Sequence, residues 1–166
     1  MTSEESAVPA GDAPAPLLDQ RFVLDALVAS RAGSAEYRGH HALLGSPVTV
    51  FVVAPAEWTP PADVTGVRAA AERAQQLRLH PHVARVFEVG QEGGGIYIIE
   101  EPLEGPSLAA WATSGTVSTA DATRVARHLV DGLRFAHHGG VLHGGLAADL
   151  VTMVSVAPPF AMLRGF

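Results

Sequence analysis

The side chains that could carry out chemistry in this sequence are mainly histidines and carboxylates, because the chain contains neither cysteine nor lysine. All 11 basic residues are arginines. Adjacent side chains on a helix point in different directions, so His137 and His138 do not form a natural chelating pair. We expect no metal site from the eight histidines, which are His40, His41, His80, His82, His128, His137, His138 and His143. Ser107 and Ser118 stand at predicted helix starts, and we interpret them as caps rather than nucleophiles.

Composition favours a packed globular domain over a disordered chain. Hydrophobic residues make up 48% of the 166 residues and charged residues 17%. The net charge of −6 makes nucleic acid an unexpected partner. The lack of cysteine excludes disulfides and thiolate chemistry and fits a cytoplasmic protein. The N-terminus has no signal-peptide pattern, and no apolar run reaches the roughly 18 residues that span a bilayer. A membrane anchor beyond Phe166 stays an open alternative.

Strand-like patterns dominate the first half of the chain. Residues 1–20 are rich in proline and small or acidic residues, and they predict a disordered leader. Residues 22–28 lead through a Ser/Arg/Gly turn to residues 36–38, which predicts a hairpin. The β-branched run from Val48 to Val53 predicts a buried strand. Residues 67–79 favour a helix, and two more strands are expected at 83–89 and 95–99.

The second half of the chain is predominantly helical. Residues 107–112 predict a short helix. The clearest helix begins near Ser118, where a hydroxyl precedes Asp121 by three residues in a variant of the capping box. Apolar residues then recur at helical spacing as far as Ala136, and Gly139-Gly140 ends the pattern. The order of elements predicts an α+β fold.

Three segments, in order and at matching spacing, resemble a protein kinase of the bacterial Ser/Thr type. Residues 79–86 (LHPHVARV) are similar to the link between helix C and the fourth strand of that family. Residues 96–108 (IYIIEEPLEGPSL) are similar to its fifth strand, hinge and following turn. Residues 133–143 (LRFAHHGGVLH) are similar to the end of helix E and the start of the catalytic loop.

The resemblance implies a small antiparallel β-lobe with one helix, followed by the first helices of a helical lobe. By this alignment the β-lobe spans residues 21–101, and the hinge and the start of a truncated helical lobe span 102–166. A helix E without its usual neighbours would expose the apolar face of residues 122–136. We therefore expect that face to be covered either by more chain or by a partner.

The same alignment implies that the phosphate-transfer groups of the family are absent. A kinase positions its nucleotide with a strand lysine, metal-binding acids and a catalytic base. Phe51 stands in the place of the lysine, and Gly145 in the place of the base. Leu150 and Gly165 replace the metal-binding Asn and Asp. Asp149 is the one acid in the loop, and it matches a variable position of the motif.

The groups around the phosphates and the adenine are also altered. Gly33 is the one glycine left where the family has a Gly-rich loop, and Arg31 is the nearby cation that could substitute for lysine, although poorly. Glu72 lies one residue from the position of the helix C glutamate.

The resemblance implies that nucleotide would contact the carbonyl of Glu101 and the N–H of Leu103 in the hinge. Glu100 occupies the gatekeeper position, where a carboxylate is costly unless it is hydrogen-bonded. Thr49 replaces a small alanine. We expect no cofactor and no metal ion, although weak ATP binding stays open.

Two classes of function follow from these residues. The first is a pseudokinase that serves as a protein-binding or regulatory module in signalling, with a partner such as an active kinase or a phosphopeptide-reading domain. The second is a weak or atypical ATP-binding Ser/Thr protein kinase. A third interpretation is a truncated fragment of a longer kinase-like protein.

Overall fold

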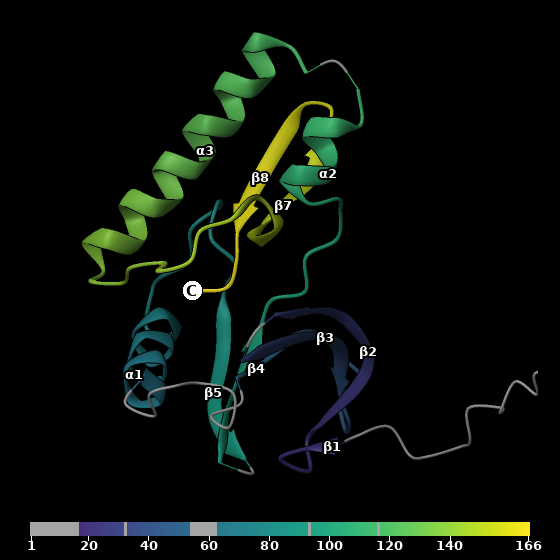
Figure 1. Ribbon diagram of the computed structural model, residues 1–166, viewed down its shortest axis with the longest axis vertical. Coiled ribbons are helices and arrows are strands. Elements are labelled where there is room, and N and C mark those ends of the chain that lie inside the picture. Colours follow the sequence, from purple (N-terminus) through teal and green to yellow (C-terminus); the bar gives the residue numbers. More distant parts are fainter. Residues whose placement is uncertain (1–16, 32, 54–62, 93, 116) are drawn as a thin grey trace, which may run out of the picture.

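The structure is a computed structural model that describes residues 17–31, 33–53, 63–92, 94–115 and 117–166. Six antiparallel strands form one curled sheet, which occupies the lower half of Figure 1. Their order across the sheet is β1-β2-β3-β4-β6-β5. The strands are β1 (Leu17–Leu18), β2 (Phe22–Arg31), β3 (Ser34–His41), β4 (Pro47–Val53), β5 (Val86–Glu92) and β6 (Gly95–Glu100). The predicted hairpin and the buried strand are therefore present.

Strand β6 lies between β4 and β5, and every one of its six residues is buried. On one face, Tyr97 and Ile99 pack with Phe22, Val48 and Val50. On the other face, Ile96 and Ile98 join the core that reaches helix α1 (Asp63–Gln75) and the second half of the molecule. A strand that is covered on both faces reads as a continuous apolar run, which is what the sequence shows.

Helix α1 ends four residues earlier than the pattern predicted. The N–H groups of Gln76 and Leu77 bond to carbonyls three residues back, which tightens the last turn. Leu77 then packs against the main core near Gly139. Strand β5 also begins later than predicted, because Val83 makes isolated bridges to His80 and Leu163 instead of joining the sheet.

Two helices follow the hinge. Helix α2 (Leu108–Thr113) begins after Ser107, whose Oγ accepts a hydrogen bond from the Ala110 N–H at 3.2 Å. Helix α3 (Thr119–His138) begins after Ser118, whose Oγ accepts from the Asp121 N–H at 3.0 Å. Both serines therefore cap helices, as predicted.

A second, two-stranded sheet lies between these helices (Figure 1). It consists of β7 (Val151–Val156) and β8 (Pro159–Leu163), and a 3-10 turn (Ala148–Leu150) precedes it. The sequence patterns did not predict β7, and only the kinase resemblance relates residues 162–166, at the end of β8, to the strand that enters the metal-binding motif of the family. Helix α3 packs along β8 and buries Val125, Gly132 and Ala136. The prediction of an exposed apolar face on residues 122–136 is therefore wrong for most of that face, although Val130 is 61% exposed.

The sheet begins before the predicted boundary at residue 21, because Leu17 and Leu18 pair with Val23 and Phe22. Residues 1–16 of the predicted leader lie outside the described part of the chain. Among the helices of the described residues, none combines the length and the apolar character needed to cross a bilayer.

Candidate functional site

A cleft of about 570 Å³ lies between the sheet, the hinge and strand β7. Val28, Glu36 and Thr49 line it on the side of the sheet, and Leu103 lines it at the hinge. Thr152 of β7 and Arg164, which directly follows β8, line the opposite side. The cleft corresponds to the place where the sequence resemblance puts a nucleotide, so its polar groups decide what it can hold.

Phe51 lies in the core and not at the end of a charged network. Its register in β4 pairs it with Glu36 of β3 and Ile98 of β6. Its half-buried ring packs against the core cluster that contains Ala71 and Ala74 of helix α1. Glu72 of that helix bonds instead to Arg68, with 2.8 Å between Nε and Oε1. Where the sequence resemblance leads us to expect a lysine–glutamate pair, the structure has an apolar contact and a surface ion pair within α1.

The connection between β2 and β3 is short. Arg31 and Ser34 are directly paired across the hairpin, so that only two residues connect the strands. Gly33 is buried and has φ of +75°, a conformation that two-residue hairpin turns require and glycine adopts readily. This turn geometry accounts for the glycine without a ligand. The side chain of Arg31 lies outside the described part of the chain.

A buried ion pair crosses the inner end of the cleft. The guanidinium of Arg164 donates from Nη1 to Oε1 of Glu36. The Arg164 side chain is 16% exposed and that of Glu36 is 8% exposed. Arg164 also donates from Nη2 to the carbonyl of Asp149 at 2.9 Å. The pair therefore joins β3 of the sheet to the residue that follows β8, and it neutralises the inner cation of the cleft.

Glu100 forms a second polar contact beside this pair. Its carboxylate, which is 1% exposed, accepts the N–H of Gly165 at 3.1 and 3.2 Å. Burial raises the pKa of Glu100 to about 7, against the opposing effects of the Gly165 N–H and the Arg164 charge. Gly165 has φ of +78°, and a Cβ there would lie 3.2 Å from Leu150 Cδ2. The Glu100 carboxyl is thus hydrogen-bonded to the backbone of Gly165, which the sequence resemblance places at the metal-binding Asp of the family.

The loop from His143 to Leu150 is anchored by the side chain of His143 and presents no acid at Gly145. His143 donates from Nε2 to the carbonyl of Arg164 at 3.0 Å. Burial lowers the pKa of His143, which favours the neutral imidazole. A side chain added at Gly145 would meet open space. Packing therefore leaves room for a larger side chain at Gly145, and the base is absent only because the residue is glycine.

Leu150 differs from Gly145 because it is buried and contacts the position of Gly165. Replacing Leu150 with Asn, the residue of the kinase motif, is expected to lower the free energy of unfolding by about 2–3 kcal/mol, since it removes buried apolar area and adds an amide. Gly145→Asp is the matched control, and its expected change is within about 0.5 kcal/mol. Urea unfolding of both variants measures the difference. Equal losses would contradict the buried role of Leu150.

The expected hinge contacts are backbone groups, the carbonyl of Glu101 and the N–H of Leu103, and both stay predictions. Leu103 lines the cleft. The side chain of Glu101 turns instead to the backbone, where Oε2 accepts the Arg85 N–H at 3.2 Å. The Glu101 N–H in turn donates to the Arg85 carbonyl at 2.8 Å. These two bonds fix the hinge to the start of β5.

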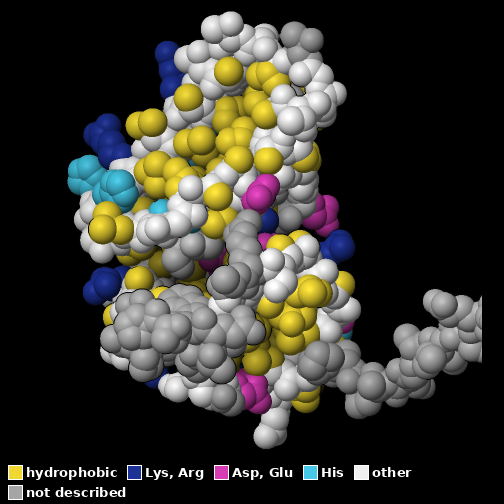
Figure 2. Space-filling view, in the orientation of Figure 1, with side chains coloured by type: hydrophobic (Ala, Val, Ile, Leu, Met, Phe, Trp, Pro, Cys, Tyr) yellow, Lys and Arg dark blue, Asp and Glu magenta, His cyan; other side chains and the backbone are white. Residues whose placement is uncertain are grey.

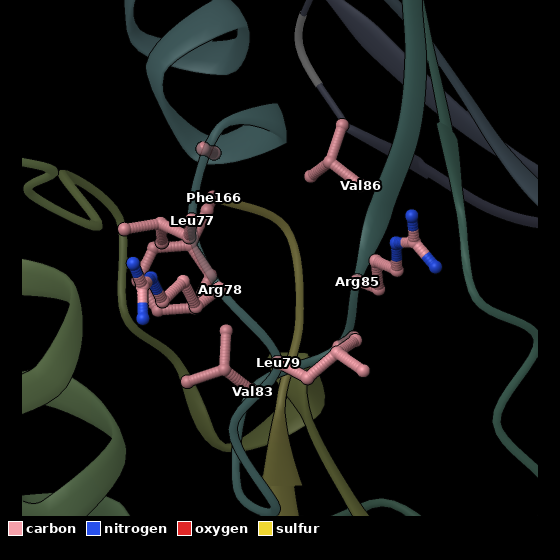
Figure 3. A pocket seen from close by; sticks show the side chains of 9 residues that line it. Leu77, Arg78, Leu79, Val83, Arg85, Val86 and Phe166 are labelled. Carbon is pink, nitrogen blue, oxygen red and sulfur yellow. The ribbon is translucent and has the colours of Figure 1, made fainter. Parts of the chain in front are cut away.

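Phe166 lies next to the C-terminal end of helix α1. Figure 3 shows Phe166 beside Leu77 and Val83, where they line a hollow of about 10 Å³. A hollow of this size holds one water molecule at most. The Phe166 ring also contacts the ring of His143, with centroids 4.7 Å apart. Phe166 is therefore a core residue that ties the loop of His143 to the sheet.

The residues of the cleft do not fit a nucleoside triphosphate with its metal ion. A triphosphate needs uncompensated cations and carboxylates that bridge through Mg²⁺. Arg164 is already neutralised by Glu36, and the acidic and amide positions of the motif are Gly145, Leu150 and Gly165. Within the described ranges, no group of three or more histidines and carboxylates is arranged to hold a metal ion. We derive no phosphoryl-transfer step from this site.

Sequence reasoning missed the pair of Glu36 and Arg164. Its members stand 128 positions apart, and no local spacing in the sequence links them. The available signals were an acid on the cleft face of a strand and an arginine directly before Gly165. Neither signal identifies the other partner without the fold.

Comparison with known proteins identifies Ser/Thr protein kinases as homologues of this chain. It is 33% identical over 121 residues to the Ser/Thr-protein kinase Pkn1 of Myxococcus xanthus, a match that covers 72% of this chain and 17% of Pkn1. It is 29% identical over 128 residues to PknL of Mycobacterium tuberculosis, which covers 76% of this chain and 32% of PknL. CBL-interacting protein kinase 17 of Oryza sativa subsp. japonica is 34% identical over 77 residues, which is 46% of this chain and 17% of that kinase. The matched part thus spans less than a third of the length of each of these relatives.

Among solved structures, the chain is similar to the crystal structure of Rad53 residues 1–466 in complex with AMP-PNP. The TM-score is 0.74 at 20% sequence identity. The match covers 89% of this chain and 38% of the Rad53 chain. The similarity therefore extends over the sheet and the segments that follow the hinge. No protein-family model matches the chain.

Proposed function

Because the chain is a protein-kinase-like segment with Ser/Thr protein kinases as homologues, we propose that it acts as a catalytically inactive module that binds a partner protein. The observation that carries this proposal is the buried pair of Glu36 and Arg164 inside the cleft. It occupies the inner end of the space with two compensated charges, where phosphates would need a free cation. A fold without transfer groups still offers its surfaces to another protein.

The alternative is a weak or atypical ATP-binding Ser/Thr kinase, and the cleft itself favours it. A space of about 570 Å³ remains open beside the hinge, with Leu103 and Thr49 along its wall. The backbone N–H of Leu103 needs no particular side chain to contact an adenine. Binding of a nucleoside without transfer would agree with our proposal, whereas transfer would not.

We predict that ATP with Mg²⁺ leaves the melting temperature of the purified chain unchanged, because the cleft lacks an uncompensated inner cation and metal-binding carboxylates. The measurement is a thermal-shift series with ATP, ATP plus Mg²⁺, adenosine, and buffer alone. Ligand that binds the native state at 100 times its Kd would stabilise it by about 2.7 kcal/mol, which is easily resolved. A metal-dependent rise together with transfer of radioactive phosphate to a protein substrate would establish the kinase alternative.

A further inference from the structure

A furrow runs along helix α3 on the side away from the cleft. It consists of three hollows of about 390, 460 and 560 Å³. The first and second share Phe135 and His138 as walls, and the second and third share His82 and Asp131. Because neighbouring hollows share lining residues, they follow one another in a row along α3 from Gly139 back to Thr119. We call this row the α3 furrow.

The α3 furrow concentrates the positive charge of an acidic chain. Five of the 11 basic residues line it, against one acid, Asp131, although the net charge of the chain is −6. The five are Arg73, Arg78, Arg124, Arg127 and Arg134. In Figure 2 the dark blue and cyan side chains gather on the left edge, where Figure 1 draws α3 and α1, and the magenta ones lie toward the middle and right.

The arginines of the furrow are available to a ligand. All five are exposed, and none forms an ion pair with a carboxylate of the described residues. Arg21, Arg68 and Arg164, in contrast, are paired with acids. Arginine presents several donors in a planar fork that matches carboxylate and phosphate oxygens. The free arginines therefore favour an anionic ligand.

Stacked rings give the furrow a rigid floor between its arginines. The rings of His82 and His128 stack with centroids 4.0 Å apart, and His80 stacks on Phe135 at 4.6 Å. His82 is fixed by a 2.9 Å hydrogen bond between Nδ1 and the carbonyl of Ala161. Burial, with a smaller effect of His82, lowers the pKa of His80 and of His128. These two rings are therefore neutral at pH 7, and the arginines supply the charge.

We propose that the α3 furrow binds an extended acidic peptide segment of a partner protein. This inference deepens the proposed function, on which it rests. Helix α3 has 20 residues and is about 30 Å long, which matches about nine residues of extended peptide. A long nucleic acid would also meet the negative remainder of the chain, whereas a short acidic segment meets mainly the furrow. Charge and length together favour the peptide.

Fluorescence polarisation with labelled ten-residue peptides tests the proposal. An Asp-Ser repeat is expected to bind, its Asn-Ser counterpart is expected not to bind, and raising the salt concentration should weaken binding. A third peptide with phosphorylated serines distinguishes phosphate from carboxylate as the preferred anion, and binding of either supports the furrow. Equal binding of the Asn-Ser peptide would overturn the proposal. A ten-nucleotide single-stranded DNA that binds more tightly than every peptide would overturn it in favour of nucleic acid.

Charge-reversal substitutions test whether the peptide binds in the α3 furrow. Arg127→Glu with Arg134→Glu should weaken the Asp-Ser peptide about tenfold or more, since each reversal turns attraction into repulsion. The matched control reverses two exposed arginines elsewhere, Arg38→Glu with Arg85→Glu, and equal weakening by this control would contradict the furrow. Asp131→Asn should tighten binding.

The peptide-binding test and the nucleotide test can fail independently of each other. Failure of every peptide to bind would remove the furrow as a docking site and leave the inactive-module proposal standing. Phosphate transfer would remove the inactive-module proposal and leave the peptide result unaffected.

Discussion

Replacing Arg164 with alanine is expected to lower the free energy of unfolding by about 3–5 kcal/mol, because it leaves the Glu36 carboxylate buried without its partner. Both side chains of this pair are largely shielded from water. The substitution also removes the hydrogen bond from Nη2 to the carbonyl of Asp149. Urea unfolding at neutral pH, followed by circular dichroism, measures the change.

Two comparisons separate the burial of charge from the loss of a contact. Arg68→Ala breaks the exposed pair with Glu72, whose side chains are 48% and 45% exposed, and should change stability by about 0.5 kcal/mol at most. The double variant Glu36→Gln with Arg164→Met removes both charges and should be more stable than Arg164→Ala alone. If Arg164→Ala costs no more than Arg68→Ala, the pair does not have the role that we give it.

The pair also explains how the two parts of the chain could stay together without a ligand. Glu36 belongs to β3 of the sheet, and Arg164 follows β8 on the other side of the cleft. The backbone adds a short bridge between Val83 and Leu163. In an active kinase, by contrast, nucleotide and metal ion contact both sides of the cleft. A built-in ion pair suits a module whose shape does not depend on nucleotide.

Sequence patterns predicted the elements whose signals are local. The cap at Ser118 and the apolar spacing up to Ala136 gave helix α3, and both features lie within the helix itself. The run from Val48 to Val53 gave β4 for the same reason. Strand β7 was missed, because its apolar start from Val151 to Met153 overlaps the end of the catalytic-loop motif and is too short to predict a strand by itself.

The family motif supplied expected positions for individual residues of the site, whereas contacts that are specific to this chain could not be predicted from the motif. Phe51, Gly145, Leu150 and Gly165 could be identified by alignment alone. The bond from the Gly165 N–H to Glu100 could not, because it joins residues 65 positions apart. The α3 furrow was missed for a related reason. Its arginines come from two helices and a connecting loop, so the sequence alone does not show that they lie along one surface.

Replacing Glu100 with glutamine is expected to stabilise the protein at pH 8 by about 3 kcal/mol. The pKa of this carboxyl is about 7 in the folded protein, against 4.5 for a fully hydrated glutamate such as that of the unfolded chain. The folded state therefore holds the proton of Glu100 more tightly, and the contribution of this group to the free energy of unfolding is greatest below pH 4.5. That contribution is lost as the pH rises from 4.5 through 7. The difference between the two pKa values corresponds to about 3 kcal/mol.

The difference in stability between Glu100→Gln and the unmodified chain should follow this titration. Glutamine resembles the protonated acid and can still accept the Gly165 N–H, so the two proteins should differ little near pH 4.5 and most above pH 7. Taking the difference at each pH removes the contributions of His80, His128 and His143, whose lowered pKa values act in the opposite direction.

A second variant distinguishes titration from hydrogen bonding. Glu100→Leu also removes the titrating group, but it leaves the Gly165 N–H without its acceptor, at a cost of about 1–3 kcal/mol. Both variants should lose the pH dependence, and the leucine variant should be less stable than the glutamine variant at every pH. A difference between Glu100→Gln and the unmodified chain that stays constant from about pH 4.5 to 8 would show that Glu100 does not titrate in this range. The gatekeeper carboxyl would then be ionised in the folded state, and a buried anion at this point would repel phosphate as well as leave the site without a metal ligand.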